Sequence, residues 1–149
     1  MTREILFRGK RTDNDEGEFV YGIPIEGEPL LGMGKRTYII TKPGVQWVDG
    51  VYMTYDGCIE VDPDTVGQFT GLTDRNSTKI FEGDIVKYTT GLGYSHICTV
   101  TYSPPYAQFQ LNFVRSGEST HFMRCSGSDC EVLGNIYDNP ELLEVSKSD

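Results

Sequence analysis

Long stretches without glycine or proline are scarce in this chain of 149 residues. Its 17 glycines and 7 prolines are spread so evenly that the longest uninterrupted stretches, residues 72–82 and 106–116, have eleven residues each. Isolated helices need about 12–15 residues to be even marginally stable. We therefore expect no long helix, and helical turns only in one of these stretches or at the end of the chain.

Positive charge is also scarce. The chain has 13 Lys and Arg against 22 Asp and Glu, a formal net charge of −9. Residues 1–42 hold seven of each sign, so the acidic surplus lies entirely in residues 43–149. Nucleic-acid-binding domains usually carry a basic surface, so we do not expect DNA or RNA as the main partner. The alternative is a basic stripe in the first segment, formed by Arg3, Arg8, Lys10, Arg11, Lys35 and Arg36.

Apolar runs are too short for a membrane span, which needs about 18 consecutive apolar residues or more. The first eleven residues, MTREILFRGKR, also lack the apolar core of a signal peptide. We therefore expect a cytoplasmic protein that does not enter a membrane. In that compartment the four cysteines are expected to be thiols.

The common motifs of enzymes are missing. Gly34-Lys35 is followed by Arg36 instead of Ser or Thr, and Pro29 stands where a phosphate-binding loop begins with glycine. The patterns G-x-S-x-G, H-E-x-x-H and C-x-x-C do not occur. Most acidic residues between 56 and 84 flank Gly or Pro, where Asp forms turns. We expect no catalytic residue, no cofactor and no enzymatic activity.

Histidine and cysteine offer one candidate metal site. Imidazole and thiolate are suitable zinc ligands, and an H-x-C pair on a strand points both side chains the same way. The candidates, however, fall in two segments far apart in the sequence, and no third group is indicated that would orient a Cys/His nucleophilic pair. We therefore predict no metal site, with Cys98 as a small core residue and both histidines near the surface. The candidates are His96, Cys98, His121, Cys125 and Cys130.

Alternation of apolar and polar residues is the main positive signal. In residues 106–116, Phe109, Leu111 and Phe113 alternate with polar neighbours, a period of two that predicts a strand. Similar runs predict strands at residues 19–25, 37–40, 51–55, 85–88 and 98–102. Pro24 in the first of these indicates an edge strand, because proline cannot donate a hydrogen bond to a neighbouring strand.

Turn residues separate these runs. Asp56-Gly57 predicts a two-residue hairpin, because type I′ turns need positive φ at both central positions. Asn139 and Pro140 have the pattern of a helix start and are followed by acidic residues. We expect one or two helical turns there, and turns elsewhere at the spacing of an all-β protein.

These patterns predict a mainly β protein. Short antiparallel strands would form a small barrel or sandwich, with at most a short C-terminal helix. Gly83-Asp84 followed by β-branched residues also resembles the start of a strand in small SH3-like barrels, so an SH3-like barrel is one form for the C-terminal part. We expect a single domain of residues 1–149. The alternative is a division into two lobes, residues 1–60 and residues 61–149.

Four segments resemble the YopX family of phage and prophage proteins. The longest is Val61–Val86, with the sequence VDPDTVGQFTGLTDRNSTKIFEGDIV. Ile5–Lys10, Val20–Gly22 and Glu131–Leu143 agree as well. The chain departs from the family near Ser77, where members usually have a glycine, so this turn is expected to be built differently.

The resemblance implies a mostly β protein of bacterial cytoplasm and carries no known activity or catalytic residues. We interpret the long signature as structural, with Asp62 and Asp84 forming turns. The leading hypothesis is a non-enzymatic accessory protein that binds a phage or host protein, or a second copy of itself. The candidate interface residues are Trp47, Tyr102 and Tyr106, since aromatic residues are enriched in interface cores.

Overall fold

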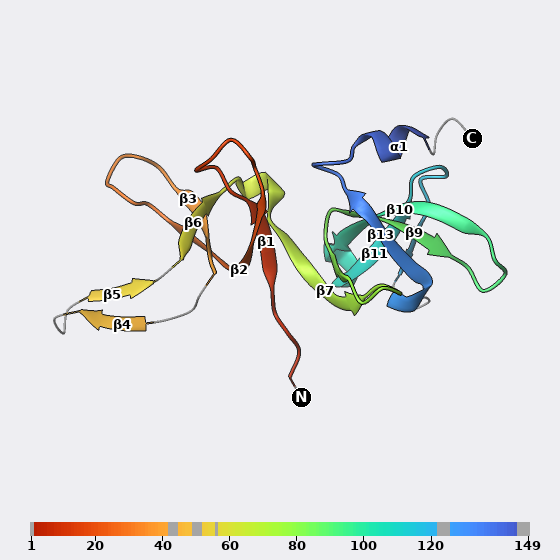
Figure 1. Ribbon diagram of the computed structural model, residues 1–149, viewed down its shortest axis with the longest axis horizontal. Coiled ribbons are helices and arrows are strands. Elements are labelled where there is room, and N and C mark those ends of the chain that lie inside the picture. The colour runs from red at the N-terminus through yellow and green to blue at the C-terminus, as the bar shows by residue number, and fades with distance from the viewer. Residues whose placement is uncertain (1, 42–44, 49–51, 56, 122–125, 146–149) are drawn as a thin grey trace. The chain divides into compact units, whose positions relative to one another are not determined.

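The computed structural model describes residues 2–41, 45–48, 52–55, 57–121 and 126–145, and only the backbone at 45–48, 52–55, 121 and 145. The chain forms two compact units, Met1–Gln68 (unit 1) and Phe69–Asp149 (unit 2). Antiparallel strands dominate both units, and the α-helix of the described residues is the short α1, Glu141–Val145 (Figure 1). The prediction of a mainly β fold with a short C-terminal helix is confirmed.

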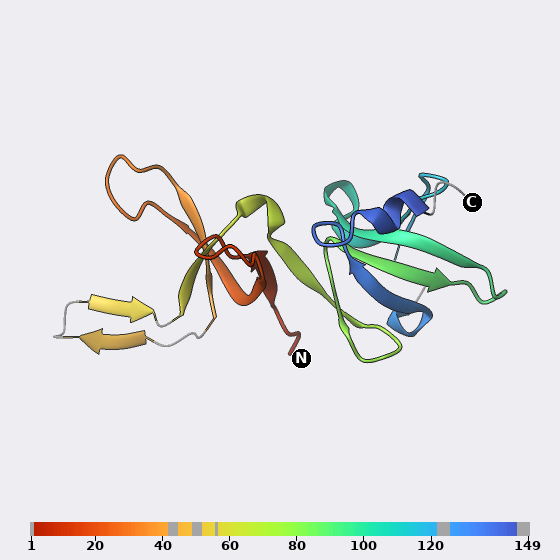
Figure 2. The same cartoon turned by 45° about the horizontal axis from the view of Figure 1, so that its top comes forward.

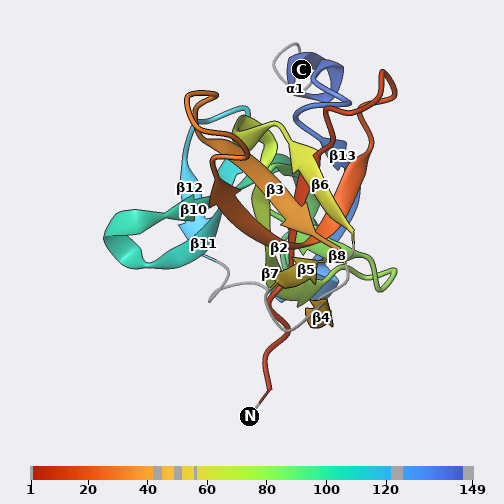
Figure 3. The same cartoon turned by 90° about the vertical axis from the view of Figure 1, so that its left-hand side faces the viewer.

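Unit 1 is built around a sheet in which β6, β3, β2 and β1 are neighbours in that order. β2, β3 and β6 lie side by side in Figure 3. β4 and β5 form a separate antiparallel pair. The strands are β1 (Phe7–Lys10), β2 (Phe19–Gly27), β3 (Arg36–Ile40), β4 (Val45–Val48), β5 (Tyr52–Tyr55) and β6 (Cys58–Val61), and the 3-10 turn η1 (Pro63–Thr65) follows.

The core of unit 1 forms because its sheet curls. Val20, Ile39 and Val61 come from three strands and are buried together. Arg11, just past β1, forms an antiparallel bridge with Val61, and the Asp62 N–H donates to the Lys10 carbonyl at 2.8 Å. The end of β1 therefore approaches β6 across the small apolar core.

The edge position expected for Pro24 is wrong for the strand as a whole, because β2 lies between β3 and β1. The position of Pro24 within β2 nevertheless explains why a proline is tolerated there. β1 pairs with β2 only as far as Gly22, whereas β3 pairs with it through Pro24 and beyond. Pro24 therefore lies where β2 has a strand neighbour on one side, and its missing N–H interrupts no continuous ladder.

Unit 2 contains a five-stranded sheet in the order β12-β11-β10-β9-β13, and β7 and β8 pair beside it. β7 crosses the boundary between the units: Gly67 and Gln68 pair with β1, and Phe69 and Thr73 pair with β8. The strands are β7 (Gly67–Thr73), β8 (Lys79–Phe81), β9 (Asp84–Thr89), β10 (Ser95–Ser103), β11 (Gln108–Phe113), β12 (Ser119–His121) and β13 (Cys130–Asn135), with 3-10 turns η2 (Pro104–Tyr106) and η4 (Gly127–Asp129).

Neither sheet is closed into a barrel among the described residues. In the five-stranded sheet, the end strands β12 and β13 pair only with β11 and β9, respectively. One face of this sheet carries the core of unit 2. Its fully buried members come from five strands, and two of them, Cys98 and Val100, alternate along β10 as the sequence predicts: Ile80, Val86, Cys98, Val100, Leu111 and Cys130.

The two-residue hairpin predicted at Asp56-Gly57 is wrong. Asp56 lies outside the described residues, and Gly57 has the expected positive φ of 75°. Yet β5 pairs with β4, and β6 pairs with β3. The glycine turns the chain from one ladder into another, because the pairing of β6 with a distant strand completes the core of unit 1.

The turn predicted near Asp62 and Asp84 is confirmed at both residues. Asp62 caps η1, where its carboxylate accepts from the Asp64 N–H at 3.0 Å. Asp84 is 2% exposed and accepts from the Phe81 N–H at 2.7 Å. Both carboxylates hold backbone in place, which supports a structural interpretation of the long signature.

Asp74, in the same signature, protects an edge of the five-stranded sheet. One carboxylate oxygen accepts from the N–H groups of Asn76 (2.8 Å) and Thr78 (2.9 Å), and the other accepts from the Val132 N–H of β13 at 2.8 Å. The Arg75 N–H also donates to the Cys130 carbonyl. The loop therefore takes the place of a further strand beside β13 and forms hydrogen bonds with part of the backbone along that edge.

Candidate functional site

The core face of the five-stranded sheet continues into a groove that the described residues of unit 2 leave open. This groove, which we call the unit 2 groove, has a volume of about 880 Å³. Its apolar lining comes from four strands or their adjoining loops and from α1: Tyr88, Tyr94, His96, Phe113, Leu133 and Leu142. The volume lies in the range of ligand pockets, which is about 300–1,000 Å³.

Strand register creates the aromatic floor of the groove. His96 pairs with Tyr88, and Phe113 pairs with Cys98, one step closer to the core. The rings of Tyr88 and Phe113 are stacked with centroids 6.2 Å apart, and the His96 ring lies 4.9 Å from that of Phe113. Side chains of one sheet face therefore change from a buried aliphatic core to an accessible aromatic surface.

The rim of the groove is polar and charged. The turn that follows β11 is closed by a Phe113 N–H to Glu118 carbonyl bond of 2.7 Å and by Gly117, whose φ is 72°. This turn presents the Arg115 guanidinium and the Glu118 carboxylate at the groove. Neither charged group forms an ion pair with any other residue that the structure describes.

Tyr94 stands at the mouth of the groove. It is 67% exposed and follows the tip of the β9–β10 hairpin, which projects beyond the other strands of unit 2 (Figure 2). The Tyr94 N–H donates to Thr90 Oγ1 at 3.2 Å, and the Thr90 N–H donates to the Tyr94 carbonyl at 2.8 Å. The backbone at Tyr94 is thus held while its ring remains available for contact.

The groove can bind an apolar or aromatic group and pair with charges at its ends. Stacking against Tyr88, Phe113 and Tyr94 suits a large flat or branched side chain. The oppositely charged rim residues, Arg115 and Glu118, suit a polar chain that continues out of the groove.

The candidate metal ligands are only partly described. His96 is exposed and lines the groove, whereas Cys98 and Cys130 are fully buried in the core of unit 2. The expectation that Cys98 is a small core residue is confirmed. Only the backbone of His121 is described, and Cys125 lies outside the described residues. Within the described part, no three His, Cys, Asp or Glu residues are grouped closely enough to hold a metal ion.

None of the predicted interface residues is among the residues that line the groove. Tyr102 is 42% exposed and packs edge-on against Phe109, with ring centroids 5.4 Å apart. Tyr106 is 67% exposed in η2, which follows β10 directly. Trp47 belongs to β4 in unit 1, so the three residues come from two units. Their role in binding stays a prediction.

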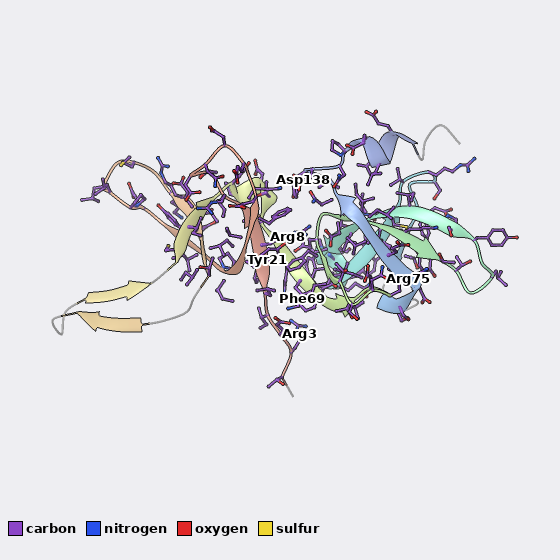
Figure 4. All side chains as sticks on the ribbon, viewed as in Figure 1. Arg3, Arg8, Tyr21, Phe69, Arg75 and Asp138 are labelled. Atoms are coloured by element: carbon purple, nitrogen blue, oxygen red, sulfur yellow. The ribbon has the colours of Figure 1, made fainter. Side chains whose placement is uncertain are left out.

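The basic stripe expected in residues 1–42 is interrupted by local contacts. Arg8, beside Tyr21 on the neighbouring strand (Figure 4), is 6% exposed, and its guanidinium carbon lies 4.2 Å from the Phe19 ring centroid. Arg11 pairs with Asp13 at 2.5 Å and Glu18 at 3.0 Å. The hydrogen bond from Arg11 lowers the pKa of Asp13.

Arg36 is neutralised in the same way, by an ion pair with Glu60 at 2.8 Å. Of the six cations proposed for the stripe, one is therefore buried and two are paired with carboxylates. A continuous basic surface, which non-specific nucleic-acid binding needs, is not favoured by this arrangement.

Comparison with known proteins identifies the relatives of this chain. The family model described as YopX protein matches residues 32–144, about three quarters of the sequence. The chain belongs to the YopX family. No curated protein matches this YopX family member. Among the described helices, none is long and apolar enough to cross a membrane.

A solved structure supports the fold of this YopX protein. The crystal structure of protein EF1440 from Enterococcus faecalis is 24% identical in sequence, and the match has a TM-score of 0.53. It covers 95% of this chain and 99% of that chain. At this level of identity the likeness shows the fold alone.

Sequence reasoning missed most of the groove. His96 is selected from the sequence, but as a metal candidate, and Phe113 only as part of a strand. Arg115 and Glu118 belong to no motif, and Leu133 occurs only within the family segment Glu131–Leu143. The available signal is the alternation itself: Tyr88, His96 and Phe113 continue the buried face of their strands toward the strand ends.

Proposed function

We propose that this YopX protein is a non-enzymatic, phage- or prophage-encoded accessory protein, and that its unit 2 groove binds a segment of a phage or host protein. The observation that carries the proposal is the continuation of the core face into an accessible aromatic floor, with a cation and an anion at its rim that form no ion pair with any other described residue. The bound segment would place a large apolar side chain on the floor and run past Arg115 and Glu118.

An apolar anchor side chain supplies only part of the binding free energy that such a complex needs. Burial of one large apolar side chain contributes about 1.5–3 kcal/mol, and contact with aromatic rings adds about 0.5–1.5 kcal/mol. Association costs an estimated 4–15 kcal/mol in lost freedom of motion. One anchor side chain is therefore insufficient, and we expect backbone and charge contacts along the segment as well, with micromolar affinity for a short peptide.

The remaining properties of the chain agree with a protein partner. The net charge of −9 opposes approach to a phosphate backbone at long range. The proposed absence of enzymatic activity rests on the missing sequence motifs, and an SH3-like arrangement of unit 2 stays a prediction. A protein of this kind acts in the cytoplasm of the bacterial host.

Selection from a random peptide library followed by fluorescence anisotropy tests the proposal. The structure offers a matched pair of variants, because Tyr94 in the groove and Tyr106 outside it are each 67% exposed. We expect Tyr94→Ser to weaken binding of the selected peptides at least tenfold, and Tyr106→Ser to change it less than twofold. Arg115→Ala should weaken binding of peptides that carry an acidic residue.

Each outcome of this experiment separates the alternatives. A loss of binding in Tyr106→Ser with no effect in Tyr94→Ser would move the site to the η2 aromatics and refute the groove. Single-stranded DNA and RNA, tested at low salt in the same assay, should not compete with the peptide. Micromolar nucleic-acid binding that weakens steeply with salt would instead support the basic stripe in residues 1–42.

A further inference from the structure

The loop between β2 and β3 in unit 1 presents three large apolar side chains to solvent. Leu30, Leu31 and Met33 are 65%, 100% and 53% exposed, respectively. The loop projects beyond the strands it connects and is coloured orange in Figures 1 and 2. Scattered exposed apolar residues are ordinary, but three within four positions at the tip of one loop form a concentrated apolar surface.

The loop is held in shape by its own hydrogen bonds. Glu28 Oε1 accepts from the N–H groups of Gly32 at 2.7 Å and Gly34 at 3.4 Å. The Met33 N–H donates to the Leu30 carbonyl at 3.1 Å. Gly32 and Gly34 have φ of 85° and 79°, a region that glycine adopts readily. A loop ordered around a carboxylate, with its apolar side chains turned outward, is shaped for contact with another molecule.

The same chain carries a surface that complements this loop. The unit 2 groove has an aromatic floor of a size that accepts branched apolar side chains. Its rim holds one cation, Arg115, and one anion, Glu118. At the base of the loop, Glu28 is bound within the loop and Arg36 pairs with Glu60. The anion Glu26 and the cation Lys35 form no ion pair with any other described residue.

We propose that the β2–β3 loop of one copy docks in the unit 2 groove of a second copy, with Leu31 on the aromatic floor and Lys35 facing Glu118. This inference rests on the proposed function, since it names a partner for the same groove. The contact joins two different surfaces, so it is head-to-tail and leaves one loop and one groove free for further copies unless a ring closes. A phage or host protein that binds the groove would compete with this self-association.

A lipid surface is the other class of partner that an apolar loop could contact. The chain's net charge of −9 opposes approach to the anionic lipids of bacterial membranes. The loop stem carries equal numbers of cations and anions and offers no polybasic segment. Charge therefore favours a second copy of the chain over a membrane.

Sedimentation velocity from about 10 µM to about 1 mM tests the proposal, since a small contact is expected in this range of affinity. Wild-type protein should associate as concentration rises. Leu31→Asp removes the loop contact and Tyr94→Ser the groove contact, so each variant alone should stay monomeric. Leu31→Asp keeps an intact groove and Tyr94→Ser keeps an intact loop. A mixture of the two variants should therefore form a one-to-one dimer that does not grow further.

Control variants test whether the association depends on the proposed contacts. Ile5→Asp, at another exposed apolar position in unit 1 (55% exposed), should associate like the wild type. Lys35→Glu and Glu118→Lys should each weaken association at least fivefold, and the double variant should recover it. Circular dichroism should show that each variant keeps the wild-type spectrum.

Three outcomes would overturn the proposal. These are a wild-type protein that stays monomeric throughout, association that persists in Leu31→Asp, or mixed variants that do not pair. Leu31-dependent sedimentation of monomeric protein with phosphatidylglycerol vesicles would likewise replace it with a membrane contact. If library peptides still bind the groove of a monomeric protein, self-association is refuted while the proposed function stands.

Discussion

Replacement of Asp74 by alanine should strongly destabilise unit 2. Asp74 is 5% exposed, and its carboxylate accepts backbone hydrogen bonds from Asn76, Thr78 and Val132. The first two donors lie on an exposed turn, where water can replace the carboxylate. The third lies in β13, which is partly buried, and there a lost acceptor leaves an N–H with little access to water.

The size of the effect follows from these differences. A hydrogen bond to a charged group contributes about 1.5–3 kcal/mol, and an unsatisfied buried donor costs about 1–3 kcal/mol. Counting the Val132 bond in full and the two exposed bonds only in part, we expect Asp74→Ala to lower the free energy of unfolding by about 2–4 kcal/mol. Asp129→Ala is the control, because it removes only exposed bonds, which the Ser126 N–H and hydroxyl donate to the carboxylate, and it should cost about 1 kcal/mol.

Urea denaturation followed by far-UV circular dichroism measures the loss of stability, and hydrogen–deuterium exchange locates it. Exchange in Asp74→Ala should accelerate in β13 and β9 and remain unchanged in β2 and β3. A variant as stable as the wild type to within about 0.5 kcal/mol, the usual effect of a surface substitution, would refute the structural role assigned to the carboxylate. So would a loss of protection centred in unit 1.

The remaining predictions concern pH, a close backbone contact and a turn. Burial by itself raises the pKa of Asp74, but hydrogen bonds from Val132, Thr78 and Asn76 outweigh it and lower the pKa below its ordinary value. The difference in unfolding free energy between wild type and Asp74→Ala should therefore be complete above pH of about 4 and shrink as the pH falls through the lowered pKa. A series of denaturation experiments from pH 7 to pH 2 measures this difference. Gly22→Ala should destabilise unit 1 by about 2 kcal/mol or more, because the added Cβ would lie 1.9 Å from the Ile40 carbonyl oxygen. Gly27→Ala is the control and should cost less than about 1 kcal/mol, because a Cβ added there meets no neighbouring atom within 4 Å. Ser77→Gly should raise the melting temperature through a gain of up to about 1 kcal/mol, because Ser77 has a φ of 65°, and a lower melting temperature would contradict this account of the turn.

Local signals in the sequence predict much of this fold. β11 follows from the alternation around Leu111, and α1 from the Asn-Pro start at residues 139–140. The departure from the family pattern near Ser77 marks a residue that adopts the left-handed conformation, for which glycine is the usual choice. In each case, a few neighbouring residues contain the physical cause.

Pairing between distant strands could not be predicted in this way. Asp56-Gly57 has the sequence of a hairpin turn, but β6 pairs with β3 because Val61 then completes the core of unit 1. Pro24 signals an edge, yet the signal cannot show that β1 covers only part of β2. Both differences arise from contacts of high sequence separation, which local propensity does not encode.

The groove could not be predicted from the sequence for the same reason. Its floor depends on the register that sets His96 opposite Tyr88, and its rim depends on a turn that follows β11. From the sequence, Tyr106 is predicted to be an interface residue, whereas Tyr94 is not considered. The sequence does not show that Tyr94, rather than Tyr106, lies beside an accessible apolar face.

Nuclear magnetic resonance gives the most direct test that the groove is the binding site. Isotope-labelled protein would be titrated with a library-selected peptide while the amide resonances are followed. The account predicts the largest shifts at Tyr88, Tyr94, His96 and Phe113 and at Leu133, and no shifts beyond noise near Tyr102 and Tyr106. Shifts confined to residues 101–109 or to unit 1, with the groove resonances unchanged, would contradict it.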